Sequence, residues 1–170
     1  MSIFKPTATA ERITGINLSA LSKLGVRVIL LDVDNTVVSY RDKTPIDGCL
    51  EWVNEALKEG FELFIVSNNQ RYERVKLVAS QFSLPFEYLA LKPLPKGFIR
   101  VLRRTRCRRE ECIVIGDQIF TDVLGANLAG MKSVLLAPIE EETGVSFKIR
   151  RKLEKRLREK YSKTVPDISE

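Results

Sequence analysis

The sequence predicts an α/β fold in which a parallel sheet carries helices on both of its faces. Two observations predict this fold class. Apolar runs of strand length alternate with segments of helical periodicity along most of the chain, which is the pattern of successive β–α–β units. In addition, 44% of the 170 residues are hydrophobic, which is enough for one domain with its own core.

Five apolar runs have the length and the continuous hydrophobic character of strands that are buried on both faces of a sheet. Their expected bounds are residues 26–32, 61–67, 88–91, 112–117 and 133–137. The first run is interrupted only by Arg27.

Segments with helical spacing of apolar residues lie before and between these runs. They are residues 17–24, 47–59, 71–82, 96–106 and 121–129. Gly60 and Gly130 stand where glycines commonly end helices. The expected organisation is one domain over residues 1–145, a basic amphipathic helix over residues 146–163 and a frayed tail over residues 164–170.

The composition excludes several classes of protein. No run approaches the roughly 20 apolar residues of a membrane span, and the first residues lack the pattern of a signal peptide. The chain has no histidine, which argues against a histidine-dependent triad and a zinc site. The cysteines, at 49, 107 and 112, show no metal-binding spacing, so reduced thiols in the cytoplasm are expected.

Two acids follow the first predicted strand, and their spacing predicts chemistry. Asp32 and Asp34 are two residues apart, so an extended backbone would direct both side chains to the same face. The carboxyl end of a strand in an open α/β sheet is where ligands bind. Two neighbouring carboxylates repel each other, and a hard cation such as Mg²⁺ together with a phosphate would resolve this repulsion.

Polar residues of the kinds used in phosphate chemistry also follow the next three strands. Ser67 and Asn68 follow the second strand, Lys92 follows the third, and Asp117 with Asp122 follows the fourth. The carboxyl ends of parallel strands meet at one rim of a sheet, so these side chains are expected to lie together.

This ordered set resembles the motifs of the haloacid dehalogenase (HAD) superfamily of phosphohydrolases, over residues 26–137. The segments LLDVDNTVV, VSNN, KPLPKGF and VIGDQIFTDVLGAN are similar to the YqeG-type branch of subfamily IIIA, which includes phosphatidylglycerophosphate phosphatases. The resemblance implies a Rossmann-like HAD fold. It also implies an Mg²⁺-dependent phosphatase that works through an aspartyl-phosphate.

The resemblance assigns a role to each main residue of the site. Asp32 would be the nucleophile, because a carboxylate that attacks phosphorus divides one difficult step into two. Asp34 would be the general acid and then the base that activates water. Ser67 and Lys92 would bind and neutralise the phosphoryl group. Mg²⁺ would be held by Asp32, Asp117 and the backbone carbonyl of Asp34.

Several further residues are candidates for supporting roles, and each of them has more than one interpretation. Asp122 would order the metal's water ligands or fix Lys92, although an acid is also favoured at a helix start by the dipole alone. Lys96 competes with Lys92 for the catalytic role, and the Lys-Pro-x-Pro pattern favours Lys92. Asn68 and Thr36 are further supporting candidates, and the Asp34-Asn35-Thr36 segment also has the composition of an ordinary turn or cap.

The spacing of the motifs leaves no room for a cap domain between Asp34 and Ser67 or between Ser67 and Lys92. A capless enzyme has an open site, which suits a phosphate displayed on a lipid head group or a protein better than a small metabolite. The resemblance implies that the reaction is the conversion of phosphatidylglycerophosphate to phosphatidylglycerol. The alternatives are a phosphatase for a soluble or protein-bound phosphomonoester and a non-catalytic RNA- or ribosome-associated assembly protein.

The net charge of +6 is unevenly distributed. Residues 146–163 carry nine Lys or Arg and two Glu, a net charge of +7, so the remaining residues sum to −1. In this segment Ile149, Leu153, Leu157 and Tyr161 form a narrow apolar stripe. The helix would dock this stripe on the domain or on a second subunit, or hold the enzyme at the anionic inner face of a membrane. No aromatic-rich pattern accompanies the charge, which argues against nucleic acid as the partner.

Overall fold

The computed structural model describes residues 2–140 and 145–169, and side-chain surroundings from residue 152 onward in the last helix. A sheet of six strands forms its centre, in the order β1-β6-β5-β2-β3-β4. Every neighbouring pair of strands is parallel. The strands are β1 (Ala8–Ala10), β2 (Val28–Leu31), β3 (Glu62–Val66), β4 (Phe86–Glu87), β5 (Cys112–Gly116) and β6 (Lys132–Leu136). The predicted α/β class with a parallel sheet is confirmed.

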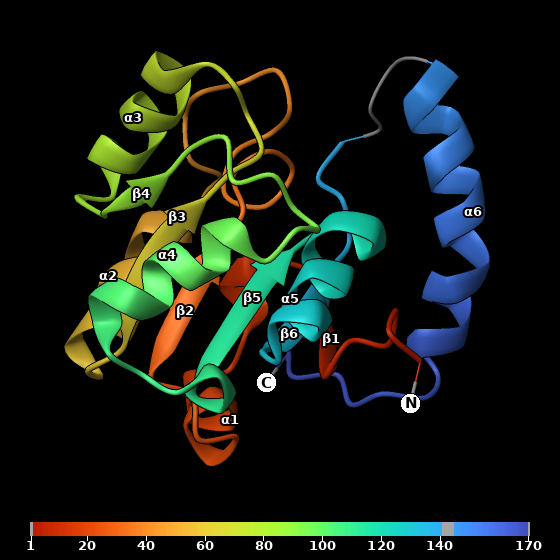
Figure 1. Cartoon of the computed structure of the whole chain (residues 1–170), viewed down its shortest axis with the longest axis horizontal. Helices are drawn as coiled ribbons and strands as arrows, with labels where there is room; N and C mark the ends of the chain where they lie inside the picture. Colours follow the sequence, from red (N-terminus) through yellow and green to blue (C-terminus); the bar gives the residue numbers. More distant parts are fainter. Residues whose placement is uncertain (1, 141–144, 170) are drawn as a thin grey trace.

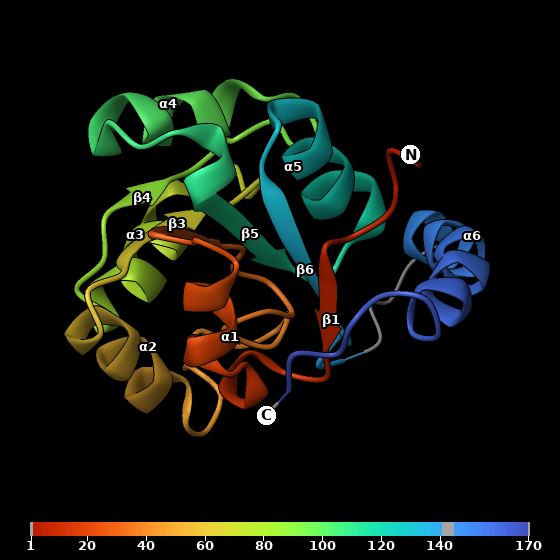
Figure 2. The same ribbon diagram turned by 90° about the horizontal axis from the view of Figure 1, so that it is seen from below.

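Helices cover both faces of this sheet (Figures 1 and 2). One face carries α1 (Leu18–Lys23), α2 (Cys49–Lys58) and α3 (Tyr72–Gln81), and the other carries α4 (Lys96–Thr105) and α5 (Leu124–Ala129). The alternation along β2 explains the two cores. Ile29 and Leu31 pack toward the first set of helices, whereas Val28 and Leu30 pack with residues of α4 and α5.

The order of the strands creates a crevice between β2 and β5. From β2 the chain proceeds to β3 on one side, whereas β5 lies on the other side, so the direction of winding reverses at this point. Leu31 is in register with Ile65 of β3 and Ile115 of β5. The residues that follow these three strands therefore leave the sheet side by side, and they include Asp32, Ser67 and Asp117.

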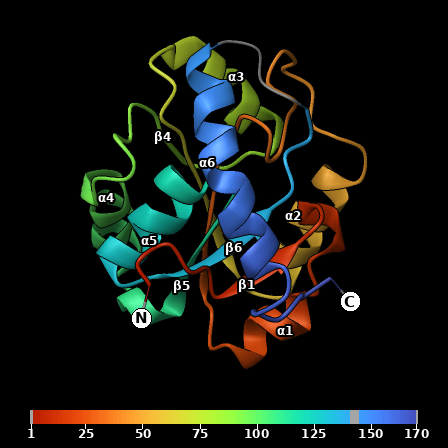
Figure 3. The same ribbon diagram turned by 90° about the vertical axis from the view of Figure 1, so that its right-hand side faces the viewer.

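The last helix, α6 (Val145–Tyr161), lies at the β1–β6 side of the sheet next to the turn that precedes α5 (Figures 1 and 3). Tyr161 and Val165 join Leu135 of β6 in a third buried cluster, with Leu157 packed against it. Leu153 is exposed, so the predicted apolar stripe docks only in part. Ile149 lies outside the residues whose side chains are described.

Two parts of the edge of the sheet differ from the sequence-based expectation. The edge strand β1 was not predicted, because three small or polar residues carry no hydrophobic run. The segment after α6 was expected to be frayed, but residues 164–169 lie against β1. The Thr9 amide donates to the Pro166 carbonyl at 2.9 Å, the Ile168 amide donates to the Thr9 carbonyl at 3.0 Å, and Ile168 is buried.

Two internal boundaries also differ. Strand β4 ends at Glu87, and the strand predicted at 88–91 is an irregular loop in which Leu89 and Leu91 have φ values of 47° and 59°. The helix expected over 121–129 begins earlier, with a π-helical turn η3 (Ile119–Val123) that leads into α5. Wide turns of this kind are frequent at functional sites.

Within the described residues, neither the segment between Asp34 and Ser67 nor the segment between Ser67 and Lys92 contains an additional domain. The first segment contains α2, and the second contains α3 and β4. Among the described residues, no helix combines the length and the apolar character needed to cross a bilayer.

Candidate active site

Asp32 stands at the end of β2 and begins a tight turn. Its amide donates to the Ile115 carbonyl of β5 at 3.0 Å, and the residue is only 7% exposed. In the turn, the amides of Thr36 and Val37 donate back to the Val33 carbonyl, and Asn35 adopts a left-handed φ of 60°. This reversal leaves Asp34 on the rim while Thr36 is buried inside the turn.

Lys92 is buried between two carboxylates. Its Nζ lies 2.6 Å from Asp32 Oδ1 and 2.6 Å from Asp122 Oδ1. Burial alone would lower the pKa of Lys92, but the charges of Asp122 and Asp32 outweigh it and raise the pKa above its usual value. The ammonium group is therefore charged throughout the neutral range.

Asn68 fixes the backbone of Lys92. Its side chain accepts from the Lys92 amide at 2.7 Å and donates to the Lys92 carbonyl at 2.9 Å. Lys96, the other lysine considered, is exposed at the start of α4 and does not line the cavity beside Asp32. The geometry thus places Lys92 rather than Lys96 beside the predicted nucleophile.

Three buried carboxylates converge at this point. Ligand oxygens of Asp32, Asp117 and Asp122 all lie within 4.8 Å of one another. Burial raises the pKa of Asp32 well above its usual range, Lys92 acts in the opposite direction, and the charges of Asp122 and Asp117 raise it further. Hard carboxylate oxygens in such an arrangement are the ligands that Mg²⁺ and similar cations prefer, so these residues fit a divalent cation.

Asp122 reaches this position because the chain before it is compact. Its Oδ2 accepts from the Gln118 amide at 3.1 Å, and a Cβ atom at Gly116 would overlap with its carboxylate. The expectation that Asp122 fixes Lys92 agrees with this geometry. The sequence assigned Asp117 and not Asp122 to the metal, whereas the structure brings both acids into the same cluster.

Asp34 points toward α3, away from the three-carboxylate cluster. Its Oδ1 lies 2.6 Å from Nη2 of Arg74, and its Oδ2 accepts from the Asn69 side chain at 3.3 Å. Arg74 also donates to the Tyr40 carbonyl at 3.3 Å. Sequence reasoning missed Arg74, because its partner lies 40 residues earlier in the chain and the arginine belongs to no local motif.

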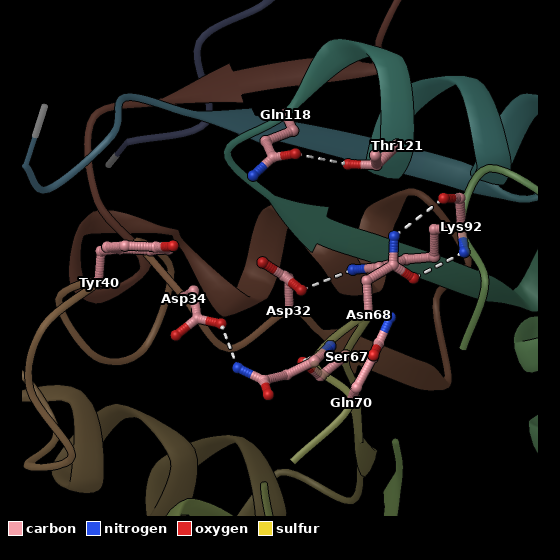
Figure 4. A pocket seen from close by; sticks show the side chains of 10 residues that line it. Asp32, Asp34, Tyr40, Ser67, Asn68, Gln70, Lys92, Gln118 and Thr121 are labelled. Carbon is pink, nitrogen blue, oxygen red and sulfur yellow. Dashed lines mark hydrogen bonds and ion pairs between the residues drawn. The ribbon is translucent and has the colours of Figure 1, made fainter. Parts of the chain in front are cut away.

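A cavity of about 460 Å³ opens above these side chains (Figure 4). Asp32 and Lys92 face each other in it, with Ser67 and Asn68 beside them. The residues that line it are Asp32, Asp34, Tyr40, Ser67, Asn68, Asn69, Gln70, Lys92, Gln118 and Thr121. The sequence analysis assigned roles to five of these residues and none to the other five. Of those five, Tyr40, Asn69, Gln70 and Gln118 lie in the flanking loops, and Thr121 lies in η3.

Helix α6 holds the loop that follows β5. Glu154 is fully buried, and its Oε1 accepts from the amides of Ile119 at 2.9 Å and Phe120 at 3.3 Å. Arg158 donates to the carbonyl of Asp117 and, at 2.9 Å, to the carbonyl of Leu136. The same loop carries Asp117 and Asp122, so α6 braces the acidic cluster from outside.

The chain is similar in sequence to known proteins. The HAD-hydrolase-like family model matches residues 90–144. The chain is 36% identical over 154 residues to the "Probable phosphatase YqeG" of Bacillus subtilis, covering 91% of this chain and 89% of that protein. It is also 28% identical over 108 residues to the glyceraldehyde 3-phosphate phosphatase of Pyrococcus furiosus, covering 59% of this chain and 44% of that protein.

Solved structures show the same fold. The magnesium-bound HAD-hydrolase YfnB of Bacillus subtilis aligns with a TM-score of 0.59 at 15% identity, covering 71% of this chain and 91% of that one. The cobalt-bound deoxy-D-mannose-octulosonate 8-phosphate phosphatase of Haemophilus influenzae aligns with a TM-score of 0.53 at 12% identity, covering 75% and 77%. The chain belongs to the HAD-like hydrolase family, and its enzyme class is phosphatase.

Proposed function

We propose that this phosphatase is Mg²⁺-dependent and hydrolyses phosphomonoesters through a phosphoryl group carried on Asp32, with phosphatidylglycerophosphate as its substrate. The observation that carries the proposal is the buried Asp32–Lys92–Asp122 chain of ion pairs at the base of an open cavity. A carboxylate held beside a permanent ammonium group is positioned to attack a phosphorus atom whose charge that ammonium offsets.

Asp32, Asp34 and Ser67 have separate roles in the two chemical steps. An oxygen of Asp32 attacks phosphorus, and the bond to the leaving alkoxide breaks. Asp34 gives its proton to that alkoxide and then takes a proton from the water that releases phosphate. Arg74 and Asn69 hold the Asp34 carboxylate in one orientation. Ser67 lies in the cavity wall, where its hydroxyl can donate to a phosphoryl oxygen.

A divalent cation fits the same place. Asp32 and Asp117 would hold Mg²⁺ together with the backbone carbonyl of Asp34, and Asp122 would keep Lys92 in position. The cation would offset the repulsion between the phosphate and the attacking carboxylate.

The substrate proposal is supported by the open site and by the resemblance of the motifs to those of the phosphatidylglycerophosphate phosphatases. The exposed side of α6 adds to it, because its cations would attract an anionic membrane surface, on the order of 1 kcal/mol each. These exposed cations are Lys152, Lys155, Arg156 and Lys160. A soluble phosphomonoester is the second candidate, favoured by the similarity to an archaeal phosphatase named for glyceraldehyde 3-phosphate.

The test compares phosphate release from phosphatidylglycerophosphate in mixed micelles with release from glyceraldehyde 3-phosphate, with Mg²⁺ and with a chelator. We expect rapid release from the lipid, which stops in Asp32→Asn and in the chelator. Release from the soluble ester alone would overturn the lipid proposal and keep the chemistry. Full activity of Asp32→Asn on either compound would overturn the mechanism.

A further inference from the structure

Large apolar side chains are concentrated on the loop that delivers Lys92 to the site. In this leucine loop, residues 88–94, the exposed fraction is 40% for Leu89, 44% for Leu91 and 52% for Leu94, and Tyr88 is also exposed. Ala90 and Lys92, which alternate with them, are buried. The loop therefore places its small and catalytic residues inward and its leucines outward.

Backbone hydrogen bonds fix the leucine loop in a conformation that leaves its leucine side chains exposed to solvent. The Leu89 amide donates to the Asn69 carbonyl at 3.2 Å, and the Ala90 amide donates to the Ser67 carbonyl at 2.9 Å. Both hydrogen bonds join the loop to the residues after β3. Leu89 and Leu91 also have positive φ values, which residues other than glycine seldom adopt.

Exposed aromatic and cationic residues lie on the segments next to the leucine loop and to the lining of the cavity. The rings of Tyr72 and Tyr88 meet edge to face, with centroids 5.1 Å apart, and both residues are exposed. Tyr40 is exposed and lines the cavity itself. Arg71 and Lys96, at the starts of α3 and α4, add exposed positive charge.

We infer that the leucine loop, with the neighbouring tyrosines, is the surface by which the enzyme docks on an anionic lipid bilayer, so that a phosphate head group can enter the cavity beside it. This inference rests on the proposed lipid substrate. Leucine side chains gain free energy on leaving water, tyrosine favours the membrane interface, and the cations meet anionic head groups. A small soluble substrate would need none of these residues around the cavity.

The chain offers a matched pair of variants. Leu89→Asn with Leu91→Asn removes two exposed leucines, and asparagine tolerates a positive φ, so the loop should keep its conformation. The control is Leu57→Asn with Leu128→Asn, whose leucines are 42% and 52% exposed. Leu57 and Leu128 lie near the ends of α2 and α5, where the chain turns back to the amino ends of β3 and β6.

Each protein is sedimented with vesicles that contain phosphatidylglycerol and assayed on micellar phosphatidylglycerophosphate and on p-nitrophenyl phosphate. We expect the loop variant to lose about tenfold or more in vesicle binding and lipid turnover, from the apolar area removed, and to keep its rate on the aryl phosphate. The control variant should bind vesicles and turn over lipid as the unmodified protein does.

Equal vesicle binding by the two variants would overturn the inference. A dimer in ultracentrifugation that becomes monomeric only in the loop variant would overturn it too, because the leucines would then belong to a subunit interface. If the unmodified protein binds vesicles through the leucine loop but hydrolyses no lipid, the inference stands and the proposed lipid substrate fails.

Discussion

Lys92 is the residue that connects the acids of the site. It pairs with Asp32 and Asp122 at once, and Asn68 holds its backbone from both sides. The raised pKa of Lys92 has a defined consequence for stability. Because the folded pKa lies above the ordinary value of 10.5, the charge of Lys92 stabilises the fold up to a pH of about 10.5 as long as its carboxylate partners are ionised. On the alkaline side this contribution is lost as the pH rises through the folded pKa.

Replacing Lys92 should therefore affect both stability and turnover. We expect Lys92→Met to lower the free energy of unfolding by about 3 kcal/mol, because it leaves buried carboxylates without their cation. It should also reduce kcat by roughly a thousandfold, the upper range for loss of one charge-stabilising group. Chemical denaturation and phosphate release measure the two effects. Lys96→Met is the control, and an equal loss of activity in that variant would contradict the assignment of Lys92.

Arg74 is the residue that controls Asp34. We expect Arg74→Gln to lower kcat about tenfold, because the Asp34 carboxylate would lose the partner that orients it, while KM changes little. The control is Arg71→Gln, an exposed arginine at the start of the same helix. Steady-state kinetics separates the two parameters. A rise in KM alone would show instead that Arg74 contacts the substrate.

Among the secondary-structure elements, α6 has the least expected role. The sequence suggested a surface helix, and its exposed side is indeed basic. Its buried side, however, holds the loop of Asp117 and Asp122 through Glu154 and Arg158. Removal of residues 146–170 would therefore disturb the acidic cluster and the edge of the sheet, so such a truncation does not isolate membrane binding.

A substitution in α6 should accordingly reach the metal site. We expect Glu154→Ala to leave two loop amides without their acceptor, to lower the free energy of unfolding by about 2 kcal/mol and to weaken Mg²⁺ binding. Glu154→Gln should restore much of the affinity, because an amide oxygen still accepts from those amides. Calorimetric titration with Mg²⁺ measures the affinity, and Glu159→Gln, on the exposed side, is the control. A less stable variant with unchanged affinity would reduce Glu154 to a purely structural role.

At the scale of the whole molecule, the fold brings the site together by a reversal of winding. The crevice between β2 and β5 has Asp32 on one side and Asp117 on the other, and the loops after β3 and β4 supply Ser67 and Lys92. No single segment of the chain could form the site, since the residues that meet at Lys92 are 60 and 30 positions away from it.

The parts predictable from sequence are those with a local signal. Strands that are buried on both faces of the sheet appear in the sequence as apolar runs. The acids and the lysine that follow these runs predict the site, because their residue types and their order along the chain form a recognisable pattern. Strand β1 and residues 164–169 have no such signal, because their pairing is tertiary. Arg74 and Glu154 were missed for the same reason, since their partners lie 40 and 35 residues away.

Whether Asp32 carries the phosphoryl group is tested by reacting Asp34→Asn with p-nitrophenyl phosphate. This leaving group needs no acid, so Asp32 should still be phosphorylated, whereas hydrolysis should stall without the base. We predict a burst of nitrophenol that is equimolar with the enzyme, with phosphate attached to the peptide that contains Asp32. The double variant that carries Asp32→Asn as well as Asp34→Asn should show no burst. An equal burst in the double variant, or phosphate on another residue, would show that Asp32 does not carry the phosphoryl group.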